Sequence, residues 1–290
     1  MTNSKIAVHI TFYVDRDINL KLIKLNKVLK SYLSLSKKVF IFVHTNVVIK
    51  KNLKSVTFVT HNLKKKDPFK LSWLCRTLME KQKNSFDYFI YSEDDIIFSK
   101  SNFMSWKILK DICMKNDFNL AFVRTETSNK NKSIWSIDQP QKLNKFIKIS
   151  NQTFILLHNP YCAMWIYDKF EFTKFIKSEF WNLNNWVGDN AFTHLKTREK
   201  SAIGWNGLNM SRYIASIVPI KNKRILNEFC IKHLNTKYIE YGPFSIPLTQ
   251  LVEKKISKFK KKKFTYIKRT CLTLKFFYRK YMRINLKKYK

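Results

Sequence analysis

The stretch "DYFIYSEDDIIFS", residues 87–99, decides the fold. Its apolar run "YFIY" predicts a buried strand, and three consecutive acids, Glu93, Asp94 and Asp95, follow at its end. Successive side chains on a strand point to opposite faces, so we expect Glu93 and Asp95 to share one face and Asp94 to take the other. The question raised by this stretch is why a very basic protein places a cluster of acids at the end of a buried strand.

Two carboxylates on one face repel each other, and they remain ionised most easily when a cation lies between them. Carboxylate oxygens suit hard divalent ions such as Mg²⁺ or Mn²⁺. Active sites of α/β sheets lie at the carboxyl ends of the strands, which is where these acids lie. The alternative is structural, with the acids capping a loop or pairing with nearby lysines.

Outward from this stretch, strands and helices alternate along the chain. Before it, the sequence predicts strand 5–14, helix 19–35, strands 38–49 and 55–63, and a helix that starts at Asp67 and Pro68. After it come helix 102–116, extended segment 119–127, hairpin 145–157, extended segment 160–168, helix 169–181, and a turn and helix within 186–205. Mostly apolar strands mixed with helices indicate an α/β fold, a mixed sheet covered by helices on both faces.

Composition fits a globular chain with an excess of positive charge. Of 290 residues, 45% are hydrophobic, which is enough for a sizeable core, and 56 Lys and Arg oppose 20 Asp and Glu. Such a field attracts phosphates on nucleotides, lipids or nucleic acids. A lysine-rich, glycine-poor composition is also what an AT-rich genome produces, so the charge of the body does not by itself define a partner.

The cysteines and the N-terminus indicate a cytoplasmic protein. The five cysteines are widely spaced and contain no C-x-x-C, which favours reduced core thiols. The first residues, "MTNSKIAVHITFYV", lead directly into a strand without the pattern of a signal peptide. No run of about 18 apolar residues is present, so we expect no spanning helix.

A strand ending in a short acidic motif of the D-x-D type, here Glu93-x-Asp95, resembles the nucleotide-sugar glycosyltransferases of the GT-A fold. The order of the surrounding blocks agrees: "TFYVDR" (11–16), "DPFKLSWLCR" (67–76), "NPYCAMWIY" (159–167) and "CIKHLNTKY" (230–238). The resemblance implies one GT-A-like, Rossmann-like domain over residues 1–250. Its nucleotide-sugar half would be 1–100 and its acceptor half 101–250.

The same resemblance implies a metal-dependent glycosyltransferase of class EC 2.4 that moves a hexosyl or pentosyl unit from a nucleotide-sugar. Asp95 would bind Mn²⁺ or Mg²⁺ directly, Glu93 would bind it through water or contact the ribose, and His233 would complete the metal shell. The metal would neutralise charge on the leaving nucleotide. The family has Asp where this chain has Glu93, so the role of Glu93 is less defined than that of Asp95.

Inverting members of the fold use a carboxylate to deprotonate the acceptor hydroxyl. Glu199, in "TREKSAIG", and Asp189, in "VGDNAF", are the two candidates, and the small residues after Glu199 favour it. Asp189 also reads as a helix cap, and Glu199 as a surface ion pair. A retaining mechanism would need neither residue as the base.

Aromatic and basic residues supply the candidate substrate contacts. Phe12 or Tyr13 could stack on the nucleobase, but only one of two neighbours on a strand can face the cleft. Arg16 could meet a phosphate, and Arg76 could reach the diphosphate or pair with Glu80. For the donor we also include Asp94. Tyr161 and Trp165 are the candidate acceptor contacts, since aromatic faces suit the apolar faces of sugars.

The C-terminal segment from residue 251 is expected to be a basic, aromatic, helical tail. Residues 254–290 hold 16 Lys and Arg and no acid, interleaved with Phe, Tyr, Leu and Ile. We expect it to bind an anionic membrane surface on the cytoplasmic side, which suits a glycan or lipid-linked acceptor in cell-surface polysaccharide or glycoconjugate synthesis. The alternatives are a solvated extension, or a nucleic-acid-binding protein or metal-dependent nuclease that uses the tail to grip phosphates.

Overall fold

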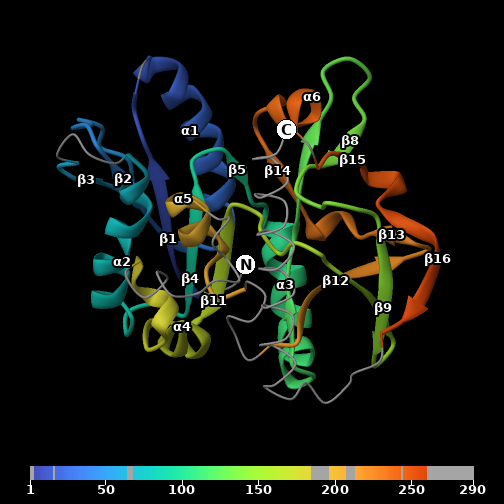
Figure 1. The fold of residues 1–290 in the computed structure, drawn as a ribbon. Coiled ribbons are helices and arrows are strands. Elements are labelled where there is room, and N and C mark those ends of the chain that lie inside the picture. Colours follow the sequence, from blue (N-terminus) through green and yellow to red (C-terminus); the bar gives the residue numbers. More distant parts are fainter. Residues whose placement is uncertain are drawn as a thin grey trace, which may run out of the picture.

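The computed structural model describes residues 3–15, 17–63, 68–183, 196–206, 213–242 and 244–259. They form three sheets with helices packed around them (Figure 1). The predicted α/β class, with a Rossmann-like mixed sheet covered on both faces, is confirmed. The predicted helical tail lies, from residue 260 on, outside the described residues.

The first sheet has the strand order β11-β4-β1-β2-β3. Its first four strands along the chain run parallel, and β11 is antiparallel to β4. This sheet brings the carboxyl ends of β1 and β4 side by side, which is where α/β folds place ligands. The bounds are β1 Lys5–Phe12, β2 Lys38–Thr45, β3 Val56–Thr60, β4 Tyr88–Glu93 and β11 Met164–Asp168.

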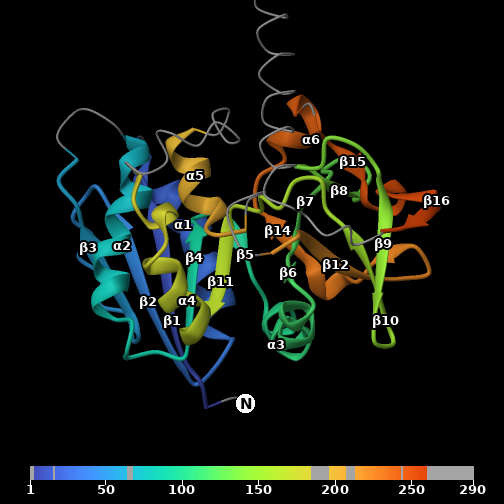
Figure 2. The same ribbon diagram turned by 60° about the horizontal axis from the view of Figure 1, so that its bottom comes forward.

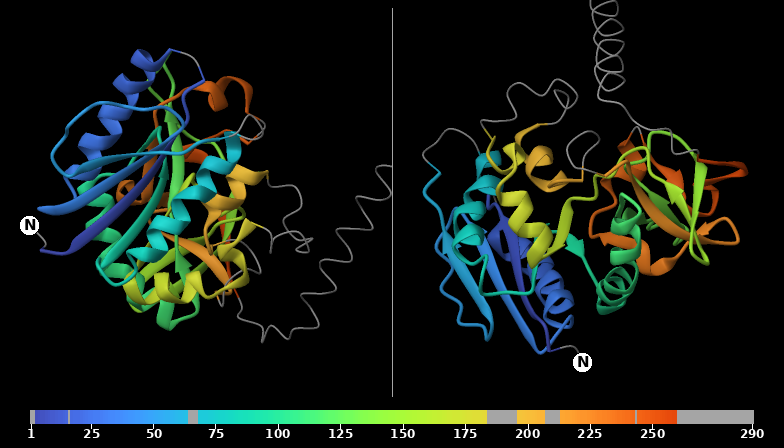
Figure 3. Two further views of the ribbon diagram at one scale, coloured as in Figure 1. Left: turned by 90° about the vertical axis from the view of Figure 1, so that its left-hand side faces the viewer. Right: turned by 90° about the horizontal axis from the view of Figure 1, so that it is seen from below.

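Helices cover both faces of this sheet. Helix α1 (Ile18–Leu33) lies on one face, while α2 (Leu71–Lys81), α4 (Lys169–Ile176) and α5 (Thr197–Ile203) lie on the other (Figure 3). Asp17 caps α1 by accepting hydrogen bonds from two backbone amides, which satisfies donors that the helix leaves free. The turn η1 (Pro68–Lys70) leads into α2, as the proline predicts. Asp67 lies outside the described residues.

The second half of the chain forms two further sheets beside the first (Figures 1 and 2). One has the order β13-β12-β10-β9-β16 with β6 paired to β12, and the other has the order β15-β8-β7-β14-β5. The latter sheet carries part of the site described below. The strand bounds are β5 Ile96–Ile97, β6 Phe118–Leu120, β7 Val123–Thr127, β8 Ile134–Ser136, β9 Leu143–Ile149, β10 Gln152–Leu156, β12 Ala215–Lys221, β13 Arg224–Ile225, β14 Cys230–His233, β15 Ile246–Pro247 and β16 Val252–Lys258.

The remaining helices are α3 and several short ones. Helix α3 (Lys100–Lys115) follows β5 and starts with a capping box between Ser99 and Asn102. The short ones are η2 Glu179–Trp181, η5 Asn227–Phe229, α6 Lys237–Tyr241 and η6 Leu248–Gln250. No helix of the described residues is both long and apolar enough to cross a bilayer.

Three of the differences from the sequence prediction matter most for the site and the tail. Strand β4 ends at Glu93, so Asp94 and Asp95 lie in a turn and the alternation of a strand does not apply to them. Strand β8 forms within residues 128–141, a polar segment whose composition predicts a loop. Strand β16 pairs with β9, so the α/β domain continues to at least Phe259, past the predicted boundary at residue 250.

Candidate functional site

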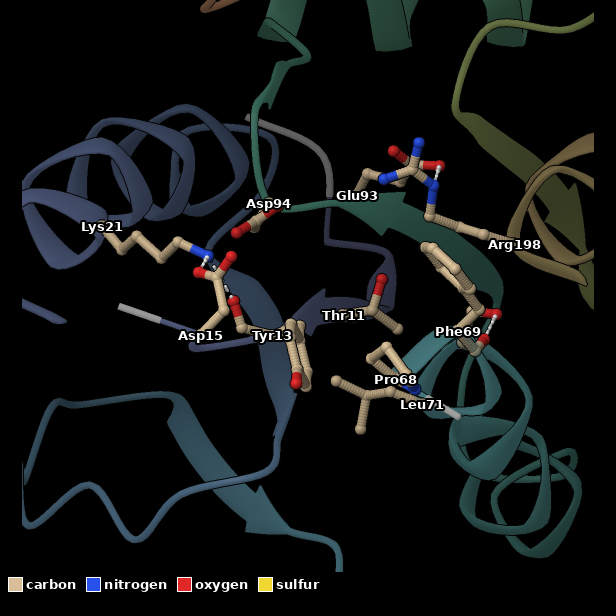
Figure 4. Close-up of a pocket in the computed structure, with 11 residues that line it drawn as sticks. Thr11, Tyr13, Asp15, Lys21, Pro68, Phe69, Leu71, Glu93, Asp94 and Arg198 are labelled. Carbon is tan, nitrogen blue, oxygen red and sulfur yellow. Dashed lines mark hydrogen bonds and ion pairs between the residues drawn. The ribbon is translucent and has the colours of Figure 1, made fainter. Parts of the chain in front are cut away.

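A cavity of about 350 Å³ opens at the carboxyl ends of β1 and β4 (Figure 4). Thr11 and Tyr13 line it from the end of β1, and Glu93 and Asp94 line it from the end of β4. Helix α5 adds Arg198 on the far side. The acid cluster therefore lies at the sheet edge where the sequence predicts an active site.

Asp95 follows the two acids of the cluster that line the cavity, and it contacts His233. Its Oδ2 lies 2.9 Å from His233 Nε2 and accepts a hydrogen bond of 2.9 Å from Asn235. Its Oδ1 is buried and has no hydrogen-bond partner among the described residues. A buried carboxylate oxygen without a partner is costly, which makes it a place for a missing cation or water.

His233 lies between two carboxylates. Its Nδ1 is 2.7 Å from Oε1 of Glu126, on the side of the ring opposite Asp95. Burial disfavours the charged imidazole, but the hydrogen bond and charge of Asp95 outweigh burial and raise the pKa of His233. Burial likewise works against the charged form of Asp95, yet His233 holds the pKa of Asp95 below its ordinary value.

The donor set of this pair fits a hard divalent cation in part. Asp95 offers an unpartnered carboxylate oxygen, and His233 offers a ring nitrogen beside it. Among the described residues, no cluster of three or more His, Cys, Asp and Glu side chains is arranged to hold a metal ion. The protein thus supplies two of the predicted ligands at one point, and the other ligands of such an ion would come from substrate and water.

Glu93 belongs to a different contact group. Its Oε1 accepts a hydrogen bond of 3.1 Å from the hydroxyl of Tyr161 and lies 3.6 Å from Nε of Arg198. Burial raises the pKa of Glu93, and the charge of Arg198 opposes that rise. Tyr161 is buried, so it touches the site through its hydrogen bond to Glu93 and not by stacking its ring on a sugar.

Asp94 faces the opposite wall of the cavity (Figure 4). Burial raises the pKa of Asp94 and the neighbouring acids add to the rise, while Lys21 opposes it. Lys21 forms an ion pair with Asp15 and donates a hydrogen bond of 2.8 Å to the carbonyl of Tyr13. Lys21 and Arg198 are the Lys and Arg side chains that line this cavity within the described part of the chain.

Glu199 follows Arg198 on α5. Its Oε1 lies 3.9 Å from the guanidinium of Arg198, so the ion pair that the sequence allows is present but long. Its Oε2 is buried and has no hydrogen-bond partner in the described residues. Helix α5 ends at Ile203, and a Cβ on the next residue, Gly204, would lie 2.5 Å from Trp165, so a side chain there would clash with the core.

The side chains of three predicted contacts are buried and do not line the cavity. Phe12 is 0% exposed in the core, which leaves Tyr13 as the neighbour that faces the cleft. Arg76 is 4% exposed and donates to the carbonyls of Phe180, Trp181 and Ser201.

Trp165 is 2% exposed and donates its indole N–H to Ser201. Glu80, the alternative partner of Arg76, instead accepts a hydrogen bond from Trp181. Arg16 and Asp189 lie outside the described residues, so their predicted roles stay predictions.

Sequence reasoning missed four residues that the structure brings to the site: Glu126, Arg198, Lys21 and Asn235. Glu126 lies near the end of the extended segment 119–127, as Glu93 lies at the end of its own strand. An acid at the end of a strand was the signal that could have found it. The other three follow no local pattern, since only the fold brings them near the acids.

No protein-family model matches the chain, and no curated protein matches it. Among solved structures, the fold is similar to that of a glycosyltransferase involved in the glycosylation of the major capsid of PBCV-1. The TM-score is 0.37 and the identity 14%, over 81% of this chain and 96% of that one. It is also similar to the galactosyltransferase LgtC in complex with donor and acceptor sugar analogs, with a TM-score of 0.34 and 11% identity, over 68% of this chain and 69% of that one. With TM-scores below 0.5, these similarities say nothing of the function, which the residues of the site must decide.

Proposed function

We propose that the protein is a metal-dependent glycosyltransferase that moves a sugar from a nucleotide-sugar to a glycan or lipid-linked acceptor. The observation that supports this most is the Asp95–His233 pair beside a cavity at the carboxyl ends of parallel strands, with Oδ1 of Asp95 buried and unpartnered. A nucleoside diphosphate needs such a combination of a cation site and a neighbouring polar cavity.

In this proposal, Asp95 and His233 hold Mn²⁺ or Mg²⁺. The bound ion supplies a Lewis acid that stabilises negative charge on the departing diphosphate. Glu93, held by Tyr161, orients Arg198 toward the cavity. Arg198 and Lys21 place two positive charges on the cavity walls, where they favour a diphosphate.

Tyr13 and Asp94 lie on the wall near Lys21, and they are the side chains proposed to contact the nucleoside. Glu199 is proposed as the base that accepts the proton of the acceptor hydroxyl, since its Oε2 is buried without a partner. Asp189 remains the alternative base, and a retaining reaction would use neither carboxylate in this way.

The C-terminal tail is proposed to hold the enzyme at an anionic membrane on the cytoplasmic side. The strand that leads into it is itself basic: Lys254, Lys255 and Lys258 of β16 are exposed. Lys223 donates a hydrogen bond of 2.8 Å to the carbonyl of Lys254, and so adds a fourth cation to this edge. A cationic edge that continues into a basic, aromatic tail favours anionic lipid.

The direct test is release of nucleoside diphosphate from a panel of nucleotide-sugars, with Mn²⁺ or with EDTA. We expect at least one donor to be hydrolysed slowly, or transferred to a glycan acceptor, only when the metal is present. If no donor gives metal-dependent release of nucleoside diphosphate, the proposal of a glycosyltransferase is wrong.

A further inference from the structure

Glu126, at the end of β7, is a buried acid for which the proposed reaction has no role. Its side chain is 0% exposed, and both of its carboxylate oxygens are engaged. Oε1 lies 2.7 Å from Nδ1 of His233, and Oε2 accepts backbone N–H bonds of 3.1 Å from Tyr238 and 3.0 Å from Ile239. These two residues belong to α6, so one carboxylate joins the imidazole to the helix that follows it.

Strand pairing brings the side chains of Glu126, His233 and Asp95 together, with His233 in the middle. Strand β14 lies between β7 and β5 in its sheet. It runs parallel to β7, with Thr125 opposite Lys232, and antiparallel to β5, with His233 opposite Ile96. The residue after Thr125 is Glu126, which β7 brings next to His233, and Asp95 lies in the turn just before β5, so His233 has a carboxylate on each side.

The two nitrogens of the His233 ring have different partners. Nδ1 contacts Glu126, and Nε2 contacts Asp95. Backbone N–H groups only donate, so Oε2 of Glu126 is an acceptor. A metal ion on Nε2 takes the lone pair of that nitrogen, so the hydrogen of the neutral ring is then on Nδ1, which can donate it to Oε1 of Glu126 over 2.7 Å. Without a metal, Nε2 lies 2.9 Å from Oδ2 of Asp95 and can carry the hydrogen of that contact instead.

We infer that Glu126 is a positioning residue that holds His233 in the Nδ1–H tautomer, with Nε2 directed at the cation site beside Asp95. The inference rests on the proposed function, because it needs His233 to bind a metal. Carboxylates behind a ligating histidine commonly fix its tautomer and ring orientation, and their loss weakens metal binding roughly 10- to 100-fold.

Glu126→Gln tests the inference without changing the size of the side chain. The amide oxygen of the glutamine is expected to accept from the two N–H groups of α6, because its NH₂ cannot. The NH₂ then faces Nδ1 of His233 and donates to it, which moves the imidazole hydrogen to Nε2 and blocks the metal-binding lone pair.

The readouts are the Mn²⁺ dissociation constant of the full chain, by electron paramagnetic resonance, and the tautomer of His233, by ¹⁵N NMR at the Mg²⁺ concentration that saturates the wild-type chain. We expect Glu126→Gln to raise the dissociation constant roughly 10- to 100-fold and to convert Nδ1–H to Nε2–H. Glu171→Gln is the matched control: Glu171 is also buried, bonds to Tyr213 instead, and should leave Mn²⁺ affinity unchanged. In a His233→Ala background, Glu126→Gln should have no further effect on Mn²⁺ affinity.

The outcomes separate this inference from the proposed function. A wild-type chain that binds Mn²⁺, with a Glu126→Gln variant that binds it equally well, overturns the positioning role and leaves the metal centre in place. A wild-type chain that binds neither Mn²⁺ nor Mg²⁺ overturns both. An effect of Glu126→Gln that persists in the His233→Ala background shows that Glu126 acts through α6 rather than through the imidazole, and also overturns the inference.

Discussion

Asp95 and Glu93 are close in sequence, but their side chains have different partners. Asp95 contacts His233 and Asn235, whereas Glu93 contacts Tyr161 and Arg198. The turn after β4 separates them, because the strand ends at Glu93. Asp95 is thereby available for a cation, and Glu93 is paired with Arg198.

Asp95→Asn is expected to lower the metal-dependent turnover roughly 100-fold or more, the effect expected when one residue of an active-site constellation is lost. The amide oxygen is a poorer cation ligand, and its NH₂ would sit against Asn235 or His233. The measurement is the initial rate of nucleoside diphosphate release as Mn²⁺ is titrated. Asp111→Asn, on the exposed side of α3, is the control, and equal rates for the two variants would contradict the role of Asp95.

Glu199→Gln is expected to lower kcat roughly 100-fold or more while leaving the donor KM nearly unchanged. The amide cannot accept the acceptor's proton, although its shape is kept. Transfer rates at saturating donor and acceptor for Glu199→Gln and Asp189→Asn, with Glu228→Gln as the control, identify the base. Near-normal turnover of Glu199→Gln would show that the base has been misassigned.

At the residue scale, the sequence predicted the acid cluster but not its partners. The strand "YFIY" followed by acids was enough to place Glu93, Asp94 and Asp95 at a sheet edge. Helical spacing predicts which face of a helix a residue lies on, but not which later segment packs against that face. Arg76 therefore donates to the carbonyls of Phe180 and Trp181, which its local sequence does not indicate. Glu126 was missed because its partner, His233, is distant in sequence.

At the scale of elements, the first sheet contains a row of three histidines. His9 on β1 and His44 on β2 are linked by a ring nitrogen contact of 2.9 Å, and His44 contacts His61 at 2.8 Å. Gln82, at the end of α2, lies 3.0 Å from the other nitrogen of His9. The amide oxygen of Gln82 accepts a hydrogen bond from His9. With all three rings neutral, His61 therefore donates to His44, and His44 donates to His9.

This row makes the stability of the fold sensitive to acid. Burial lowers the pKa of His9 to about 3 and that of His44 to about 2, from 6.5. The unfolded chain therefore binds more protons below pH 6.5, and stability is lost as the pH falls from that value. Each of these two histidines should reduce the free energy of unfolding by about 1.4 kcal/mol per pH unit.

The measurement is urea unfolding between pH 7 and pH 5. His44→Gln should lower stability at pH 7, because it breaks the row, but it should remove about half of the pH slope contributed by the buried pair. His158→Gln is the control, since His158 lies beside Gln141 and outside the row. A slope that His44→Gln leaves unchanged would mean that the buried pair does not set the acid sensitivity.

The elements of the first half were predicted more completely than those of the second. Strand β1 and helix α1 have strong local patterns, apolar runs and a helical stripe that starts after a capping Asp17. Strand β12 was not predicted, and it contains Pro219, a residue that argues against a strand interior, opposite Phe154. Strand β16 was assigned to the tail because its lysines resemble the basic residues that follow, and its sequence does not indicate the pairing with β9.

At the scale of the molecule, positive charge is unevenly distributed. Residues 254–290 hold 16 of the 56 Lys and Arg. The composition predicted this segment as a separate functional region, and the structure adds that its first residues form the edge strand β16. What lies beyond residue 259 stays a prediction from sequence.

The full chain is expected to pellet with vesicles containing anionic lipid, and to be released by salt, because screening weakens the attraction of its lysines. A chain ending at Phe259 should pellet less, provided that its thermal midpoint matches that of the full chain. Neutral vesicles serve as the control. Equal pelleting of both chains would contradict a membrane role for the tail, and tight, salt-sensitive binding of nucleic acid in place of vesicles would favour the alternative partner.

The most direct test of the central claim is the thermal midpoint of the full chain with nucleoside diphosphates, in the presence and absence of Mn²⁺. At about 100 times the dissociation constant, a bound nucleotide should add about 2.7 kcal/mol and raise the midpoint by roughly 4–6 °C. We predict such a rise for at least one nucleoside diphosphate only when Mn²⁺ is present, and its loss in Asp95→Asn. No rise with any nucleoside diphosphate plus Mn²⁺, or an equal rise in Asp95→Asn, would contradict the account.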